Sequence, residues 1–143
     1  MEVEKFFGNS YNNNKDFKPQ DMPVTKSKGF AAAVDDHAER GIDLNEQLIR
    51  NKPATFFMKV SGSSMINAGI FDGDIAVVDR SLKPQNGKIV IAVIDGEMLI
   101  RRYEKTMNSL RLIPETPKLS AIEINEFNDF KIWGVVTYVI RNV

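Results

Sequence analysis

A serine-rich turn at residues 60–73 (VSGSSMINAGIFDG) is the part of this sequence best suited to chemistry. It directly follows an apolar stretch and contains glycines, so the hydroxyl of Ser64 can lie where the chain turns sharply. If a short helix begins at Ser64, the free backbone N–H groups of its first turn could stabilise an oxyanion. The same residues also fit an ordinary serine-rich turn that caps a helix.

A serine nucleophile needs a general base, and few side chains of this chain qualify. There is no cysteine and one histidine, His37, which excludes thiol chemistry and multi-histidine metal sites and disfavours a Ser–His–Asp triad. A lysine made neutral by burial could replace histidine, and the natural place for it is the hairpin around residues 95–96. Its return strand instead carries Arg101 and Arg102, and arginine keeps its proton in proteins.

The composition limits the classes of partner. Lys+Arg and Asp+Glu are both 19, and a chain without basic excess is not a typical duplex-DNA binder. The first residues lack a basic start followed by an apolar run, and no apolar stretch approaches the ~20 residues that span a bilayer. The acidic run at residues 35–39 fits a solvated face. We therefore expect a cytoplasmic protein with no metal, no cofactor and no membrane partner.

The chain divides into an irregular N-terminal arm, residues 1–42, and a β domain, residues 43–143. The arm contains an asparagine-rich stretch and two prolines, Pro19 and Pro23, that break regular structure. It is too short and too irregular for a helix-turn-helix unit, so we predict a flexible arm.

The second part alternates short apolar stretches with turn residues. Asp43 fits the N-cap of one short helix. Asp95 and Gly96 form a strong two-residue hairpin signal, because both positions must take a positive φ. The expected strands are residues 55–60, 74–78, 88–94, 98–103, 110–113, 121–124 and 131–140. Short strands at this spacing predict a mostly β fold, either a β-sandwich or a partly open barrel.

Residues 60–102 resemble the catalytic core of the UmuD/LexA family of bacterial SOS-response proteins, which cleave themselves with a Ser–Lys dyad. They contain a Ser-Gly-x-Ser-Met motif, a Gly-Asp turn, a strand ending in Val-Asp, a Gly-x-Ile-Val strand and a hairpin, in the family's order. Residues 41–60 and 133–141 resemble the flanking segments of UmuD-type proteins. The resemblance covers residues 24–143 and implies the family's peptidase-like β domain with an extended N-terminal arm.

The resemblance also assigns roles to residues. Ser64 matches the nucleophile, followed by Met65, and backbone amides of these two residues would hold the oxyanion. The scissile bond would be Lys28–Gly29, although the family prefers a small residue before the glycine. Arg101 stands where the family has its general-base lysine. We therefore expect this chain to cleave itself very slowly or not at all, which leaves its status as an enzyme open.

UmuD-like proteins carry only a short arm, whereas LexA-like repressors carry a DNA-binding domain. The arm favours the UmuD type, an accessory subunit of an error-prone translesion polymerase. The resemblance then implies a homodimer that contacts a RecA–single-stranded DNA filament and a Y-family, UmuC-like polymerase, without sequence-specific DNA binding.

Three alternatives remain open: a non-cleaving dimeric interaction module of the same fold, a LexA-like repressor fragment without its DNA-binding domain, and a peptidase acting on other proteins. Apolar residues of the last strand could form the dimer surface, or half of them could face the core: Trp133, Val135, Val136, Tyr138, Val139 and Ile140.

Overall fold

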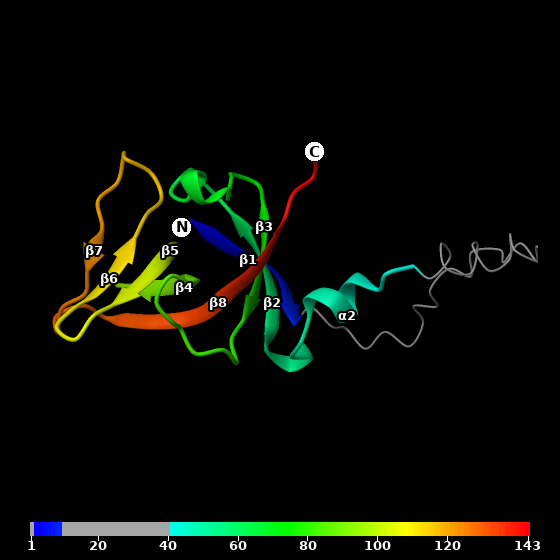
Figure 1. Ribbon diagram of the computed structural model, residues 1–143, viewed down its shortest axis with the longest axis horizontal. Coiled ribbons are helices and arrows are strands. Elements are labelled where there is room, and N and C mark those ends of the chain that lie inside the picture. The colour runs from blue at the N-terminus through cyan, green and yellow to red at the C-terminus, as the bar shows by residue number, and fades with distance from the viewer. Residues whose placement is uncertain (1, 10–40) are drawn as a thin grey trace, which may run out of the picture.

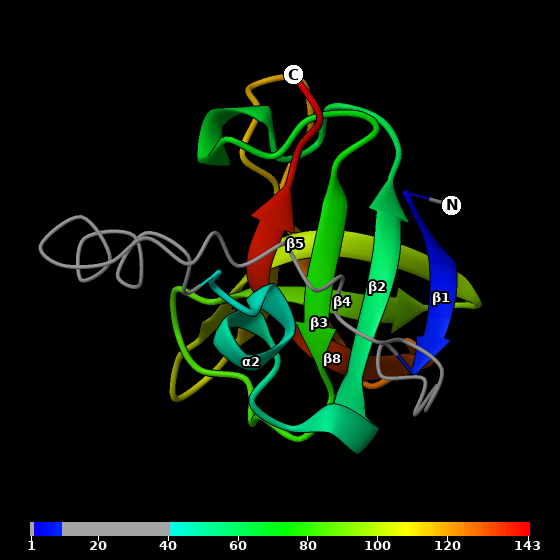
Figure 2. The same cartoon turned by 90° about the vertical axis from the view of Figure 1, so that its right-hand side faces the viewer.

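Within residues 2–9 and 41–143, which the computed structural model describes, eight strands form one antiparallel sheet (Figure 1). Along the sheet the strands follow the order β1-β2-β3-β8-β4-β5-β6-β7. Their bounds are β1 Val3–Asn9, β2 Thr55–Val60, β3 Ile75–Asp79, β4 Ile89–Ile94, β5 Glu97–Lys105, β6 Leu110–Ile113, β7 Ile122–Glu123 and β8 Phe130–Ile140. The sheet curls into a half-barrel, so that β1, β2 and β3 run across β4 and β5 (Figure 2).

Strand β4 shows why the central strands read as continuous apolar runs. Alternate residues of a strand point to opposite faces. Ile91 packs into one buried cluster with Met58, Val78 and Ile100. Val90 on the other face belongs to a second cluster, with Ala92, Ile94, Tyr103, Leu112 and Val135. The strand is therefore buried on both sides and has no polar face.

Strand β8 joins the two halves of the sheet. Its second half pairs with β3, with Val135 opposite Asp79 and Ile140 opposite Ile75. Its first half pairs with β4, and Phe130 lies opposite Ile94. The register shifts at Thr137 in the ladder with β3 and at Trp133 in the ladder with β4. Next to Trp133 lies Gly134, where a Cβ atom would lie 2.6 Å from Cγ1 of Val78. A glycine in a strand marks a bulge or a close approach, and here it permits both.

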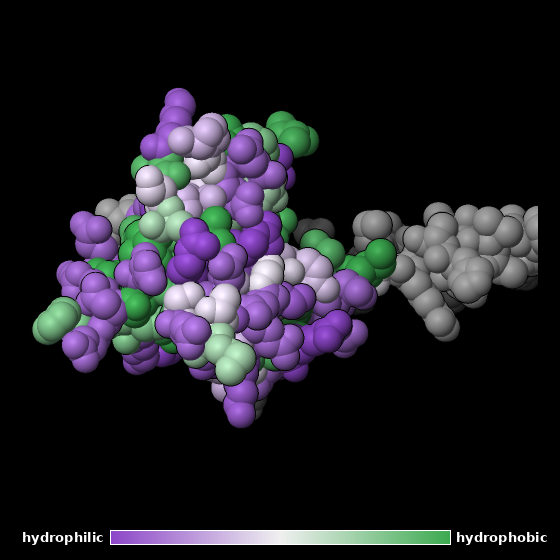
Figure 3. Space-filling view, turned by 60° about the vertical axis from the view of Figure 1, so that its left-hand side comes forward, coloured by the Kyte–Doolittle hydropathy of each residue, from purple (hydrophilic) through white to green (hydrophobic). Residues whose placement is uncertain are grey.

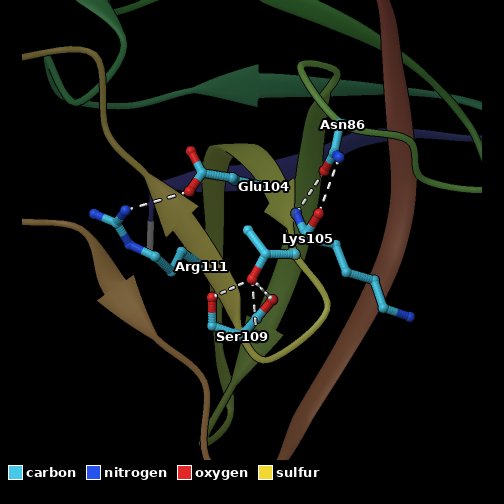
Figure 4. A network of polar contacts seen from close by, with 6 residues as sticks. Asn86, Glu104, Lys105, Ser109 and Arg111 are labelled. Carbon is cyan, nitrogen blue, oxygen red and sulfur yellow. Dashed lines mark hydrogen bonds and ion pairs between the residues drawn. The ribbon is translucent and has the colours of Figure 1, made fainter.

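The two hairpins that follow β4 are fixed by local chemistry. Asp95 and Gly96 have φ values of 49° and 86°, which confirms the predicted two-residue turn between β4 and β5. Asn86, in the segment before β4, binds the backbone of Lys105 at the end of β5. Its side-chain amide donates to the Lys105 carbonyl at 2.9 Å and accepts from the Lys105 N–H (Figure 4). The ion pair of Arg111 with Glu104 joins β6 to β5 at 3.2 Å.

The predicted mostly β, partly open barrel is confirmed. Strands β2 and β6 have the expected bounds, and the other predicted strands differ by two residues or fewer at each end. Helix α2 (Leu44–Leu48) begins after Asp43, whose side chain accepts from the Asn45 N–H at 2.9 Å. Two 3-10 turns follow, η1 (Lys52–Ala54) and η2 (Ile66–Ala68).

Strand β1 was not predicted. It lies within the segment assigned to the arm, and it pairs with β2 at the edge of the sheet. The remainder of that arm, including His37 and the acidic run 35–39, lies outside the described residues, so the division at residue 42 stays a prediction.

The apolar residues of β8 divide between the core and the surface. Val135 is buried, whereas Tyr138 and Ile140 are 37% and 40% exposed. Trp133 is covered by Phe56, with ring centroids 5.1 Å apart, and by the guanidinium of Arg80. On the face shown in Figure 3, hydrophobic side chains form separate patches among hydrophilic ones. A dimer surface on β8 stays a prediction.

Substitution of Gly134 by alanine should destabilise the fold, because the added methyl group meets the buried Val78 side chain. We expect the free energy of unfolding to fall by about 1–3 kcal/mol, measured by urea denaturation. The control is Gly41→Ala, because nothing lies within 4 Å of a Cβ there; its effect should stay below about 0.5 kcal/mol. Equal effects of the two substitutions would contradict the steric role of Gly134.

Candidate functional site

The serine-rich segment forms a loop between β2 and β3 whose base is closed by backbone hydrogen bonds. The N–H of Gly73 donates to the Val60 carbonyl, and the N–H of Val60 donates to the Asp74 carbonyl, both at 2.8 Å. Ser64 and Met65 lie inside this loop and are 5% and 1% exposed. The loop therefore holds a serine hydroxyl in a largely buried position.

A buried carboxylate anchors the far end of the loop. Asp74, 1% exposed, accepts two hydrogen bonds from Arg141, from Nε and from Nη2, each at 2.8 Å. It also accepts from the Phe71 N–H at 2.8 Å, and the Arg141 guanidinium lies 4.2 Å from the centre of the Phe71 ring. The hydrogen bonds from Arg141 hold the pKa of Asp74 below its ordinary value, although burial acts in the opposite direction.

Glu115, which lies in the segment after β6, binds the backbone of the loop. Its N–H donates to the Ser64 carbonyl at 2.8 Å, and its carbonyl accepts from the Asn67 N–H at 2.9 Å. The Glu115 carboxylate accepts from Nε of Arg102 at 2.6 Å. One residue thus ties the serine loop to strand β5, the strand that carries Arg101.

Three donors converge on one carboxylate oxygen, Oε2 of Glu2. The Ser64 hydroxyl and the Ile100 N–H each donate to it at 3.2 Å, and Nη1 of Arg101 forms an ion pair with it. Nη1 also donates to the Ile100 carbonyl at 2.8 Å. The structure therefore places Ser64 and Arg101 in contact with the same carboxylate oxygen, and the roles assigned to them stay predictions.

The site differs from the expected one at the start of the short helix. The 3-10 turn η2 begins at Ile66, after Met65 as its N-cap, and not at Ser64. Among the described residues, the backbone N–H groups of Ser64 and Met65 donate no hydrogen bond. Free backbone amides of this kind can bind an oxyanion, and the oxyanion role of these two amides stays a prediction.

Arg101 decides what this site can do chemically. A serine attacks a carbonyl only when a nearby group takes its proton. A guanidinium does not accept protons in proteins, whereas it binds a carboxylate through charge-assisted hydrogen bonds. Arg101 is 5% exposed, and within the part of the chain that the structure describes its Nε has no hydrogen-bond partner. The geometry therefore suits carboxylate binding better than acyl chemistry.

Sequence reasoning missed Glu2 and Glu115, because neither belongs to a motif and both act from distant segments. The predicted scissile bond, Lys28–Gly29, lies outside the described residues. No three His, Asp or Glu side chains gather into a possible metal site in the described ranges. Of the helices described, none is long and apolar enough to cross a membrane.

Residues 14–137 match the family described as Peptidase S24-like, and the chain belongs to that family. It is similar to Protein ImpA of Salmonella typhimurium, with 42% identity over 114 residues, 79% of this chain and 77% of ImpA. Protein SamA of Salmonella typhimurium is 38% identical over 113 residues, 79% of this chain and 78% of SamA. LexA repressor 1 of Xanthomonas campestris pv. campestris is 38% identical over 115 residues, which cover 78% of this chain and 57% of that repressor.

These matches confirm the predicted resemblance to the UmuD/LexA family. The chain is a homologue of the UmuD-like proteins ImpA and SamA.

Replacing Asp74 by asparagine should weaken the anchor of the serine loop at neutral pH. Because the pKa of Asp74 is lowered in the folded protein, its contribution is present above the ordinary aspartate pKa. It is lost as the pH falls through the lowered value. We expect a loss of about 1 kcal/mol at pH 7, modest because Arg141 is partly exposed and screened by solvent.

Urea denaturation from pH 7 to pH 2 measures this effect. The difference between the two proteins should shrink as the pH falls below the ordinary aspartate pKa, because only the wild-type chain loses the ion pair. Asp72→Asn is the matched control, since Asp72 is exposed and its carboxylate accepts from the Gly62 N–H, not from Arg141, in the described contacts. A pH-independent difference would contradict the ion-pair account.

Proposed function

We propose that this protein is a UmuD-like SOS mutagenesis protein, a homodimeric accessory subunit of an error-prone translesion polymerase of the Y family. The observation that carries the proposal is the similarity to Protein ImpA. Its identity with this chain, 42% over 114 residues, exceeds the 38% over 115 residues of the LexA repressor. This difference favours the UmuD type.

The implied partners follow from the family. A UmuC-like polymerase subunit would bind the dimer, and a RecA–single-stranded DNA filament would favour an arm conformation that the chain already samples. These partners would place the protein in the cytoplasm. The sheet itself and its exposed apolar residues on β8, Tyr138 and Ile140, are compatible with a protein-binding role.

The self-cleavage reaction of the family maps onto Ser64. A neutral lysine would take the hydroxyl proton while Oγ attacks the carbonyl carbon of residue 28. The bond between residues 28 and 29 would break, the proton would pass to the Gly29 amine, and water would hydrolyse the resulting ester. Because the arm belongs to the same chain, its effective concentration is high.

Self-cleavage is blocked or strongly slowed in this chain, because Arg101 stands at the base position. The guanidinium cannot accept the Ser64 proton. Instead, it binds the carboxylate of Glu2, and this carboxylate also accepts a hydrogen bond from the Ser64 hydroxyl. This arrangement also favours a second candidate function, a non-cleaving interaction module in which Ser64 only binds.

Substitution of Arg101 by lysine should restore self-cleavage at alkaline pH. A buried lysine loses its proton more readily than an exposed one, so cleavage should accelerate as the pH rises from 7 to 10. General acid–base catalysis typically contributes 10²- to 10⁴-fold, so we expect at least a ~100-fold faster appearance of a fragment that begins at Gly29. Gel electrophoresis and N-terminal sequencing measure the rate and the cut position.

Two controls separate the base from general effects of a new lysine. Arg102→Lys places a lysine at the neighbouring position, whose side chain faces Glu115, and should leave the chain intact. Ser64→Ala combined with Arg101→Lys should abolish any cleavage. If the unmodified arginine protein cut itself at the rate of the lysine variant, the base assignment would be wrong. If no variant cuts, the non-cleaving module is the better function.

The polymerase role predicts a direct complex. We expect the purified chain to co-elute with a UmuC-like polymerase subunit in size-exclusion chromatography, and to migrate alone as a dimer. Tyr138→Glu combined with Ile140→Glu introduces charge on the exposed residues of β8, and should weaken dimerisation or the complex at least tenfold. A monomeric chain without affinity for the polymerase subunit would contradict the proposal.

A further inference from the structure

Strand β1 is held at the edge of the sheet by both backbone and side-chain contacts. It pairs antiparallel with β2, with Val3 opposite Val60 and Glu4 opposite Lys59. Val3 is fully buried in the cluster that also contains Met65, the residue that follows Ser64. Because β1 is the outermost strand, β2 would become the edge of the sheet if β1 left.

Glu2, immediately before β1, is bound along its whole length. Its N–H donates to the Met98 carbonyl at 3.2 Å, and its carbonyl accepts from the Ser61 N–H at 2.6 Å. Its carboxylate lies between β2 and β5, where it receives the three donors described above: the Ser64 hydroxyl, the Ile100 N–H and Nη1 of Arg101. Main-chain pairing at a sheet edge plus a pocket for one side chain is an established way to recognise an extended peptide.

Burial makes this pocket selective for an anion. The side chain of Arg101 is 6% exposed, and that of Glu2 is 22% exposed. A buried cation without a paired anion is costly, so the site strongly favours an occupant with a carboxylate. The Nε of Arg101 has no partner among the described residues, which leaves this buried guanidinium a further donor for its occupant.

We propose that Ser64, Arg101 and the N–H of Ile100 form a binding site for the side-chain carboxylate of an extended peptide that adds to the edge of β2. Glu2 of this chain is the resident ligand. While Glu2 is bound, the Ser64 hydroxyl is engaged, and any other segment must first displace β1 to reach it. This binding role is independent of the polymerase partnership proposed above.

The first test removes the carboxylate from the full chain. In Glu2→Gln, amide hydrogen exchange followed by NMR should show faster exchange at two positions. One is Ile100, whose N–H donates to the Glu2 carboxylate, and the other is Ser61, whose N–H donates to the Glu2 backbone carbonyl. We expect an increase of about 10- to 100-fold, the range set by losing charge-assisted hydrogen bonds. Amides of the β4–β5 hairpin turn serve as an internal reference and should not change.

The matched control is Glu4→Gln, which removes the same charge from an exposed position two residues further on, in β1. Exchange at Ser61 and Ile100 should remain within about twofold of the wild-type rate, because surface substitutions away from specific contacts have small effects. Unchanged exchange in Glu2→Gln, or equal changes in both variants, would overturn the proposal.

The second test supplies the ligand in trans. Val3→Asp in the full chain buries a charge in the core and should release β1 from β2. A synthetic peptide with the sequence of residues 1–9 (MEVEKFFGN) should then bind and restore slow exchange at Ser61. The same peptide with glutamine at its second position should bind at least 10-fold more weakly by fluorescence anisotropy.

At a pH low enough to keep the lysine protonated, Arg101→Lys combined with Val3→Asp keeps the positive charge and should keep the preference for the acidic peptide. Arg101→Met combined with Val3→Asp should lose it. Equal affinity for the two peptides in the arginine chain would show that the carboxylate is not recognised, and would overturn the proposal.

Discussion

The whole sheet depends on β8, the strand that pairs with β3 over one half and with β4 over the other. Without it, no strand pairing among the described residues would connect β1, β2 and β3 to β4 and β5. Its register shifts, at Trp133 and at Thr137, accompany the curl of the sheet, in which the loop after β2 and strand β5 both contact Glu2. The meeting of Ser64 with Arg101 is therefore a consequence of a bent strand that carries neither residue.

A second constraint is the burial of Arg101. Placing a guanidinium inside a protein is favourable only when an anion and sufficient acceptors accompany it. The carboxylate of Glu2 and the Ile100 carbonyl supply them, and the same carboxylate engages the Ser64 hydroxyl. The site thus combines a nearly buried serine hydroxyl with a buried guanidinium and the carboxylate that both contact.

The serine loop owes its shape to contacts from outside itself. Arg141, at the end of the chain, neutralises the buried Asp74, and Glu115 binds the backbone on either side of Met65. Figure 2 shows the loop beside the C-terminal end of the chain, where Arg141 lies. A loop anchored at three points can hold a nearly buried hydroxyl in one position, whether that hydroxyl reacts or only binds.

The sequence by itself determined the local features. Apolar runs between turn residues predicted seven of the eight described strands, Asp95 and Gly96 predicted the tight hairpin, and the serine-glycine segment marked the loop with Ser64. Only the tertiary structure decided that β1 joins the sheet and that Glu2 occupies the site. Glu2 lies 62 residues from Ser64 and 99 from Arg101 along the chain, and no local periodicity records a contact at that distance. Backbone propensity acts between near neighbours, whereas a buried ion pair forms only after folding brings its partners together.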